Sequence, residues 1–385
     1  MSPGVPSIVA LLRRRAAEEP DATAFLFLAD GEREELRLTY ADLDRRARAV
    51  AAALQRRHGT EGARALLIYP PGVEFLAGFF GCLYAGAIAV PSYPPRGGRG
   101  QGRLESVARD AGASWALSTH ALLARAARDG AGALAATAWL ATDEVEDGAA
   151  DDWREPEIGP ETTALLQYTS GSTSTPKGVV VSHAHLLHNE EVIRRAFGQS
   201  AESVIVGWLP LFHDMGLMGT VLQPLFVGAP CILMSPLSFL QRPARWLQAI
   251  SRYRATTSGG PNFAYDLCAA KVSEEERRGL DLSSWSVAFN GSEPVRAETL
   301  ERFAAAFAPC GFRAESFYPC YGLAEATLFV AGGERAAAPV VAEVDALALG
   351  RHRALAPEVG RPVRRLVGCG RPWLGQQIAI ADPET

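Results

Sequence analysis

The chain of 385 residues is 48% hydrophobic and 21% charged, which is typical of a soluble globular protein. Its formal net charge of −5 lacks the basic surplus of nucleic-acid-binding proteins, so we expect no nucleic-acid partner. A chain of this length exceeds one ordinary domain, which predicts a core divided between two or more subdomains.

The cysteines and the N-terminus indicate a compartment. Six cysteines are scattered through apolar segments without a Cys-x-x-Cys pair, which predicts buried thiols in a reducing cytoplasm. No signal-peptide pattern opens the chain. The longest uncharged stretch, Phe75–Tyr93, divides at Gly86 into a helical and a strand-like part, so we expect no membrane span.

The first 57 residues predict two helices around a hairpin. The helical patterns cover Ile8–Ala17 and Tyr40–Arg57, and the hairpin strands cover Ala24–Leu28 and Glu35–Leu38. Thr39 is a suitable N-cap for the second helix, although we find no full capping box there.

The next hundred residues predict parallel βαβ units. Short apolar strands alternate with helices through residues 65–118, the pattern of a largely parallel sheet. Residues 94–102 are rich in Gly and Arg and are expected to form an exposed loop. The acidic segment 143–160 has no periodicity, and we interpret it as the link to a second subdomain.

The same alternation returns after Ser182, which is expected to cap a helix over His183–Phe197. Further strands and helices are predicted at Val204–Trp208, Gly216–Leu225, Cys231–Met234, Pro243–Tyr253, Ala255–Ser258, Trp285–Asn290, Val295–Phe307 and Arg313–Tyr318. The composition from Ala331 predicts an exposed loop, followed by strand-like segments at Leu366–Gly368 and Gln376–Ala381. The fold class is therefore α/β.

One loop, Tyr168–Gly178, has the composition of a phosphate-binding site. It holds six Ser and Thr hydroxyls, two glycines and Lys177, between strand-like runs on either side. Glycines let backbone N–H groups approach an anion, while hydroxyls and an ammonium add donors and charge. It is not the Walker pattern, because Lys177 lies between Pro176 and Gly178.

The alternative interpretation of this loop is a flexible Ser/Gly linker. The flanking strand-like runs argue against it. Among 38 Lys and Arg residues only Lys177 and Lys271 are lysines, which suggests that the loop requires a compact ammonium.

Two further motifs follow predicted strands. In Tyr318–Thr327, Gly322 allows a tight turn at a strand end, where α/β sheets bind ligands; Tyr321 could stack on a base, and Glu325 could bind Mg²⁺. The alternative is ordinary packing at the end of a strand. The second motif, Phe289–Pro294, is on its own only a turn.

The segment Trp208–Leu217 places a polar His213-Asp214 pair in an apolar run, which suggests a polar spot beside a hydrophobic cavity. A lone histidine is more often structural. The cluster His183, His185 and His188 lacks the carboxylate or cysteine of a metal site. No Gly-x-Ser-x-Gly elbow follows a strand, so Ser-His-Asp hydrolysis is not supported.

Over essentially its whole length the chain resembles the adenylate-forming superfamily, and within it the fatty acyl-AMP ligases. The loop Tyr168–Gly178 and the motif Tyr318–Thr327, with Ala324 where the wider superfamily usually has Thr, carry the resemblance. It implies two packed doubly wound α/β subdomains (1–160 and 161–332), a ligase-specific insertion (333–365) and the start of a β-rich subdomain (366–385).

The resemblance also implies the residues of the site. Lys177, His213 and Glu325 would be catalytic, with Glu325 also the metal ligand. The nucleotide would contact Thr169, Ser170, Gly171, Ser172, Thr173, Lys177, Asn290, Gly291, Ser292, Glu293, Tyr321, Gly322, Leu323 and Ala324. The acyl group would contact His213, Asp214, Met215, Met218, Ser258, Gly259, Gly260 and Phe263, although the apolar ones could simply belong to the core.

The implied reaction uses ATP and Mg²⁺ to activate a fatty acid as acyl-adenylate, followed by transfer to the phosphopantetheine arm of an acyl carrier protein in a polyketide or nonribosomal peptide pathway. The family's ribose-binding Thr-Gly-Asp motif and C-terminal lid do not occur before Thr385. We therefore expect the large N-terminal part of a longer enzyme, poorly active alone.

Three alternatives remain open from the sequence. An acyl-CoA synthetase or an amino-acid adenylation domain would share the phosphate loop. A non-catalytic module that binds acyl-adenylate or docks a carrier protein would share the pocket. Formation of acyl-AMP from ATP and dodecanoate separates the enzymes from the module.

Overall fold

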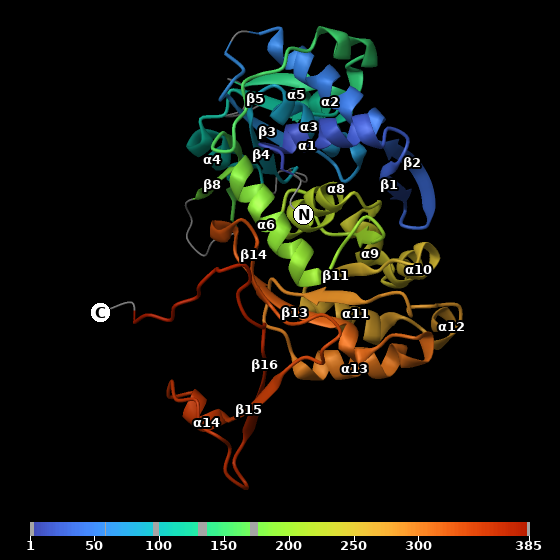
Figure 1. Ribbon diagram of the computed structural model, residues 1–385, viewed down its shortest axis with the longest axis vertical. Helices are drawn as coiled ribbons and strands as arrows, with labels where there is room; N and C mark the ends of the chain where they lie inside the picture. The colour runs from blue at the N-terminus through green and yellow to red at the C-terminus, as the bar shows by residue number, and fades with distance from the viewer. Residues whose placement is uncertain (1–3, 58, 95–99, 130–136, 170–175, 383–385) are drawn as a thin grey trace. The chain divides into compact units, whose positions relative to one another are not determined.

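The computed structural model describes residues 4–57, 59–94, 100–129, 137–169 and 176–382 (Figure 1). The chain forms two compact units. The first comprises Met1–Glu191 with Gly207–Leu237, and the second comprises Val192–Val206 with Ser238–Thr385.

The first unit contains a six-stranded sheet in the order β6-β5-β3-β4-β7-β8. These strands are β3 (Arg64–Ile68), β4 (Ile88–Ser92), β5 (Trp115–Ser118), β6 (Ala138–Ala141), β7 (Thr163–Tyr168) and β8 (Gly178–Ser182). All neighbours are parallel except β7 and β8, which form a hairpin. Because β7 pairs with β4, the sheet continues across residue 160, where we expected a subdomain boundary.

The helices of this sheet are α3 (Val73–Tyr84), α4 (Gln101–Ala111) and α5 (His120–Asp129), with α2 (Tyr40–Gln55) packed on α3. Gly81 makes that packing possible, since a Cβ there would lie 2.5 Å from Val50 of α2. The parallel βαβ pattern predicted for residues 65–118 is thus confirmed.

The N-terminal elements match their predicted positions. They are α1 (Ile8–Glu18) and the hairpin β1 (Thr23–Ala29) and β2 (Arg33–Thr39), and β1 also pairs with the parallel strand β10 (Cys231–Met234). The statement that α2 lacks a capping box was wrong. The Thr39 hydroxyl accepts the Asp42 N–H and the Asp42 carboxylate accepts the Thr39 N–H, both at 3.1 Å, so a shorter acid serves in place of Glu.

The acidic segment after β6 is ordered along α2. It forms two 3₁₀ turns, Thr142–Glu144 and Asp147–Asp152. Asp147 pairs with Arg45 at 3.1 Å and with Arg46 at 3.4 Å. Exposed pairs of this kind contribute about 0–1 kcal/mol each, so they position the segment more than they stabilise the fold.

A helix with a π-helical turn follows in the first unit. Where one helix over Gly216–Leu225 was predicted, the structure has α7 (Asp214–Leu217), a π-helical turn (Met218–Leu222) and α8 (Gln223–Val227). Pro224 gives the physical reason, because it has no N–H to donate to Thr220 and its ring would clash with that carbonyl. In the π-helical turn the Gln223 N–H donates to the Met218 carbonyl, five residues earlier, where an α-helix would use the residue four earlier.

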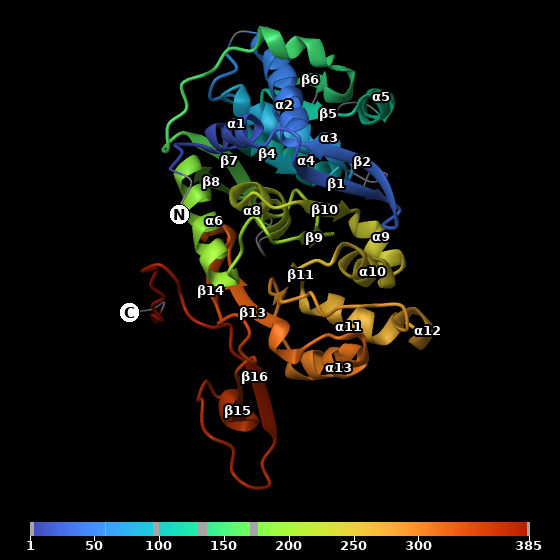
Figure 2. The ribbon, with the colours of Figure 1, turned by 45° about the vertical axis from the view of Figure 1, so that its right-hand side comes forward.

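The second unit is built on strands β9 (Ile205–Gly207), β11 (Thr257–Gly260), β12 (Val287–Asn290), β13 (Phe317–Gly322) and β14 (Phe329–Gly332). The last residue of β9, Gly207, is assigned to the first unit. The first four are parallel neighbours in that order, and β14 is antiparallel to β13. Helices α11 (Asn262–Lys271) and α13 (Ala297–Phe307) lie side by side (Figure 1, Figure 2). The aromatic rings of Trp246, Tyr265, Trp285, Phe303, Phe312 and Phe317 form its core.

The remaining helices are α6 (His183–Phe197), α9 (Pro236–Gln241), α10 (Ala244–Tyr253) and α12 (Glu274–Arg277). The predicted cap of α6 is confirmed, since the Ser182 hydroxyl accepts the His185 N–H at 3.3 Å. None of the described helices combines the length and apolar character needed to cross a membrane.

The C-terminal segment differs from its prediction. Where a loop was expected, β15 (Val341–Asp345) and β16 (Val363–Val367) form an antiparallel hairpin with α14 (Ala346–Leu349) between them. The strand predicted over Leu366–Gly368 overlaps only the end of β16. The described residues 376–381 form no strand, so the strand predicted over Gln376–Ala381 was wrong. Ile378 and Ile380 there are exposed instead of packed.

Candidate functional site

The stem of the predicted phosphate loop is a hairpin at the edge of the first unit's sheet. Strand β7 ends at Tyr168, β8 begins at Gly178, and the two residues are paired. Thr169 and the exposed Lys177 therefore stand at the two ends of the loop. The predicted contacts Ser170, Gly171, Ser172 and Thr173 lie outside the described residues.

Contacts from α4 reach this stem. The Arg103 guanidinium donates to the Thr169 carbonyl at 2.8 Å, and the Tyr168 hydroxyl donates to the Asp110 carboxylate at 2.6 Å. Burial, and then the bond to Asp110, raise the pKa of Tyr168. A Cβ on Gly178 would lie 2.9 Å from the Tyr168 ring, so a larger residue there would require the ring to shift.

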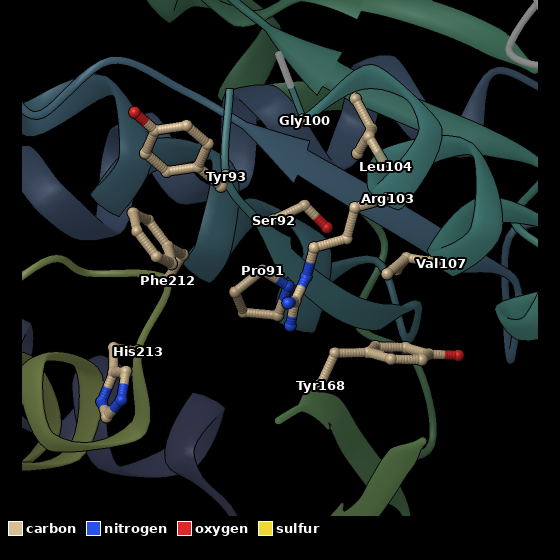
Figure 3. A pocket seen from close by; sticks show the side chains of 10 residues that line it. All are labelled: Pro91, Ser92, Tyr93, Gly100, Arg103, Leu104, Val107, Tyr168, Phe212 and His213. Carbon is tan, nitrogen blue, oxygen red and sulfur yellow. The ribbon is translucent and has the colours of Figure 1, made fainter. Parts of the chain in front are cut away.

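A pocket of ≈ 290 Å³ adjoins the stem in the first unit (Figure 3). The rings of Tyr93 and Phe212 meet edge to face at 5.2 Å, and the Arg103 side chain extends from α4 toward the end of β7. The lining residues are Pro91, Ser92, Tyr93, Gly100, Arg103, Leu104, Val107, Tyr168, Phe212 and His213. The walls are thus mostly apolar, with one guanidinium and one imidazole.

Sequence reasoning missed most of this pocket. Tyr93 follows the carboxyl end of β4, where α/β sheets bind ligands, and that position was a usable signal. Arg103 had no such signal, because it reaches the pocket from α4, whereas Phe212 belongs to the predicted segment Trp208–Leu217 and lies just before α7. Gln167 helps to place the latter, since its amide donates to the Phe212 carbonyl at 3.1 Å.

His213 lines the pocket and is paired with its neighbour. Its Nδ1 lies 2.6 Å from Asp214 Oδ1, which also accepts the Met215 N–H at 2.7 Å. The hydrogen bond with Asp214 raises the pKa of His213, against the opposite effect of burial. With Nδ1–H bonded to the carboxylate, Nε2 is the ring nitrogen left to meet a ligand.

The predicted acyl-contacting residues differ in exposure. In the first unit Met215 and Met218 are buried. In the second unit Ser258, Gly259 and Gly260 are buried in β11, where the Ser258 hydroxyl accepts from Trp246 and donates to the Val206 carbonyl. A Cβ on Gly259 would lie 2.1 Å from the Phe289 carbonyl. Phe263 is 42% exposed, and its N–H donates to Glu293 at 2.6 Å.

The Tyr321 motif forms a turn at the end of β13. Gly322 is required there, because a Cβ would lie 2.2 Å from the Leu328 carbonyl. The Leu323 N–H bonds that carbonyl at 2.9 Å and closes the turn. The Tyr321 ring is 51% exposed and Glu325 is exposed on the following 3₁₀ turn. An aromatic face and a carboxylate are thereby held on one short segment.

The neighbouring strand end supplies the other predicted nucleotide contacts. Asn290 is fully buried, and neither the nitrogen nor the oxygen of its side-chain amide has a hydrogen-bond partner among the described residues. A buried amide without a hydrogen bond lowers the free energy of unfolding by about 1–3 kcal/mol. Its place beside the predicted nucleotide contacts is consistent with a partner supplied by a ligand. Gly291 lies against Cys320, and Ser292 adopts a left-handed φ of 65°.

These two strand ends border a pocket of ≈ 790 Å³ in the second unit. Ser292, Glu293 and Tyr321 are among its lining residues, as are Val363–Val367 of β16. The hairpin is tied to α13, since Arg365 donates to Glu301 at 3.0 Å and pairs with Glu298 at 3.8 Å.

The carboxylate of Glu325 fits a magnesium ion that arrives with a nucleotide. Mg²⁺ in such sites takes one or two protein carboxylates and completes its shell with phosphates and waters. Within the described ranges no three His, Cys, Asp or Glu residues are grouped to hold a metal by themselves. The donor set is therefore suited to a shared ion and not to a protein-enclosed one.

These features define an α/β protein whose candidate sites lie at strand ends. The chain belongs to the AMP-binding enzyme family, whose sequence model matches residues 12–385. This agrees with the resemblance found in the motifs.

Individual relatives narrow the similarity. JamA of Moorena producens, a medium-chain-fatty-acid–[acyl-carrier-protein] ligase, is 44% identical in an alignment 393 residues long that covers 100% of this chain and 66% of that protein. TtuA of Teredinibacter turnerae has the same descriptive name and is 38% identical in an alignment 417 residues long. That alignment covers 98% of this chain and 65% of TtuA. The chain thus spans about 66% and 65% of their lengths.

A solved structure gives the same picture for the fold. The fatty acyl-adenylate ligase from L. pneumophila, in complex with acyl adenylate and pyrophosphate, superposes with a TM-score of 0.93 at 42% identity. The match covers 99% of this chain and 66% of that one. The predicted fold class, the α/β N-terminal part of an adenylate-forming enzyme, is confirmed.

Proposed function

We propose that this protein activates a medium- or long-chain fatty acid with ATP, as acyl-adenylate destined for an acyl carrier protein. The observation that carries the proposal is the 42% identity to a ligase solved with acyl adenylate and pyrophosphate. The carrier-protein acceptor is supported by the names of JamA and TtuA.

In the reaction a fatty carboxylate oxygen attacks the α-phosphorus of ATP. A new P–O bond forms, the bond from the α-phosphorus to the β-phosphate oxygen breaks, and pyrophosphate leaves. The protein's part is to position the reactants and to neutralise charge. Mg²⁺, when bound, would offset the phosphate charge, with Glu325 as its protein ligand.

Each candidate residue has a proposed role in that reaction. Lys177 and the hydroxyls of its loop would hold the β- and γ-phosphates. Tyr321, with its exposed ring, would stack on adenine beside Asn290 and Ser292. His213, whose pKa is raised by Asp214, would meet the reacting carboxylate or the adenylate phosphate as a cation.

Two further assignments belong to this proposal. Residues 333–365 would be the ligase-specific insertion, which is supported by the separate β15–β16 hairpin. The compartment would be the cytoplasm, which is supported by six cysteines that are all free thiols.

The first test is acyl-AMP formation from ATP, Mg²⁺ and dodecanoate, followed by mass spectrometry. The chain should form acyl-AMP, and Lys177→Ala should lower the rate by about 10- to 100-fold, the loss of one charged hydrogen bond. Lys271→Ala, which removes the other lysine, is the matched control and should leave the rate unchanged. Absence of acyl-AMP from the parent chain would contradict the proposal.

A further inference from the structure

The phosphate-loop stem, defined here as Tyr168–Thr169 and Lys177–Gly178, needs support from outside its own sheet. Among the described strands β8 is the last of the sheet, so in that part of the chain the hairpin has a neighbouring strand only on the β4 side. An edge hairpin lacks strand pairing on one side, so fewer hydrogen bonds within the sheet hold its position.

Helix α4 supplies such support through two side chains. Arg103 and Asp110 are seven residues apart, two helical turns, and so lie on one face of α4. Arg103 bonds the Thr169 carbonyl and Asp110 bonds the Tyr168 hydroxyl. Two adjacent stem residues are thereby held from a single helix.

The contact continues from Tyr168 to the lysine side of the stem. Tyr168 and Gly178 are paired across the hairpin, and the Tyr168 ring lies against the Gly178 Cα, where a Cβ would be 2.9 Å away. Gly178 follows Lys177 directly. A shift of the Tyr168 ring would therefore move the backbone that carries Lys177.

The chemistry of these contacts suggests positioning more than stabilisation. Arg103 is exposed, and its one described hydrogen bond goes to the backbone carbonyl where the chain enters the loop. Exposed polar contacts contribute little to the free energy of folding, about 0–1 kcal/mol. Because both contacts are made at Tyr168 and Thr169, where the chain enters the loop, they are better explained by positioning of the loop than by stabilisation of the fold.

We propose that Arg103 and Asp110 are positioning residues that set the place of Lys177 for the phosphates of ATP. Arg103 fixes the entry to the loop, and Asp110 fixes the Tyr168 ring, which in turn fixes Gly178 beside the lysine. This role rests on the proposed function of Lys177 as a phosphate ligand.

The scarcity of lysine allows a direct measurement. Lys177 and the exposed Lys271 are the only lysines, so acetylation by an N-hydroxysuccinimide ester can be followed at both by mass spectrometry. MgATP should protect Lys177 and not Lys271. The ATP concentration for half-protection then reports ATP affinity at Lys177 without requiring turnover.

Arg103→Gln, Asp110→Asn and Tyr168→Phe should each raise that concentration by about 3- to 10-fold, the worth of one hydrogen bond. Asp110→Asn combined with Tyr168→Phe should be no worse than either alone, because both remove one bond. Arg103→Lys should restore part of the loss. Arg109→Gln, on the same helix without a described contact to the stem, should match the parent.

The KM for ATP should rise in the same variants with a smaller change in kcat, and the melting temperature should stay near that of the parent. In a Lys177→Ala background, Asp110→Asn should raise the KM no further. Two results overturn the positioning role while the proposed function stands. One is an unchanged half-protection concentration in Arg103→Gln, Asp110→Asn and Tyr168→Phe. The other is a rise in the KM for ATP on Asp110→Asn that is as large in the Lys177→Ala background as in the parent. If ATP does not protect Lys177 in the parent, Lys177 is no phosphate ligand, and its phosphate-binding role falls together with the positioning role.

Discussion

The charge of one side chain, His213, depends on the residue that follows it. Asp214 accepts the imidazole Nδ1–H at 2.6 Å and so favours the imidazolium form. A cation at the rim of a mostly apolar pocket would attract a carboxylate or a phosphate. The activity should therefore require protonated His213 and decline as pH rises through its pKa.

Asp214→Asn tests this dependence. The amide removes the negative charge, so the pKa of His213 should fall and the alkaline decline in kcat/KM for the fatty acid should begin at lower pH. The measurement is a pH profile of acyl-AMP formation. Asp281→Asn, an exposed acid of the second unit, should keep the parent profile. An identical alkaline limb in Asp214→Asn would exclude His213 as the titrating group.

Gly322 offers a second test at this scale. In Gly322→Ala the new methyl would meet the Leu328 carbonyl at 2.2 Å, and a backbone atom cannot move aside cheaply. We expect a loss of about 1–3 kcal/mol in the free energy of unfolding, measured in urea. Gly333→Ala is the matched control, because no atom of the described residues lies within 4 Å of a Cβ there. Equal stability of the two variants would contradict the close approach of the Leu328 carbonyl to Gly322.

Among the elements, the β15–β16 hairpin depends on few contacts with the rest of its unit. Arg365 reaches Glu301 and Glu298 of α13, while the large apolar side chains Val363 and Leu366 of β16 are exposed. The pairs are partly solvated and therefore weak. The hairpin should thus open locally at low cost in free energy.

Arg365→Leu should leave the free energy of unfolding within about 1 kcal/mol of the parent and speed cleavage within residues 333–372 by proteinase K. Arg364→Leu removes the neighbouring guanidinium, which has no described partner on α13, and should not speed cleavage. Equal cleavage of the Arg365→Leu variant and the parent would show that other contacts hold the hairpin.

Elements with complete local signals were predictable from the sequence. Helix α6 begins and ends where expected, because Ser182 caps it and its apolar residues keep a helical period. Helix α5 (His120–Asp129) and strand β6 (Ala138–Ala141) were missed, although α5 has an amphipathic pattern that could have indicated it. In the β15–β16 hairpin only the end of β16 was predicted, by the segment Leu366–Gly368; β15 was missed because its first three residues are exposed and lack the alternation that burial imposes.

For the whole molecule, the motifs at strand ends were found because each carries its chemistry within one short segment, as Tyr321 to Glu325 does. The stem contacts of Arg103 and Asp110 could not be found in this way. Arg103 and Thr169 are 66 positions apart in the sequence, and Asp110 and Tyr168 are 58 positions apart. Nothing in the sequence near α4 indicates which strand end this helix contacts. Long-range contacts of this kind require the structure.

A buried histidine should make the stability of the fold depend on pH. His183 begins α6, is 1% exposed, and accepts the Ile8 N–H at its Nδ1, 3.3 Å away and 175 residues earlier in the chain. Ile8 begins α1, so this N–H has no partner within its own helix. Protonation of Nδ1 would remove the acceptor and bury a charge, which is why burial lowers the pKa of His183 to about 4.

The sign follows from proton linkage. Between pH 6.5 and about 4 the unfolded chain binds a proton at His183 that the folded chain does not. The free energy of unfolding should therefore fall by up to about 3 kcal/mol as pH drops through this window, from His183 alone. In His183→Asn this part of the pH dependence should vanish, because an amide accepts the same N–H without titrating.

Urea unfolding at pH 7, 6, 5 and 4.5 measures the difference between the parent and His183→Asn. Carboxylates titrate in both proteins, so subtraction isolates the histidine. His188→Asn, an exposed position on the same helix, should keep the parent slope. If His183→Asn loses stability with falling pH as steeply as the parent, the imidazole becomes charged inside the fold without cost, and the acceptor role at Ile8 is wrong.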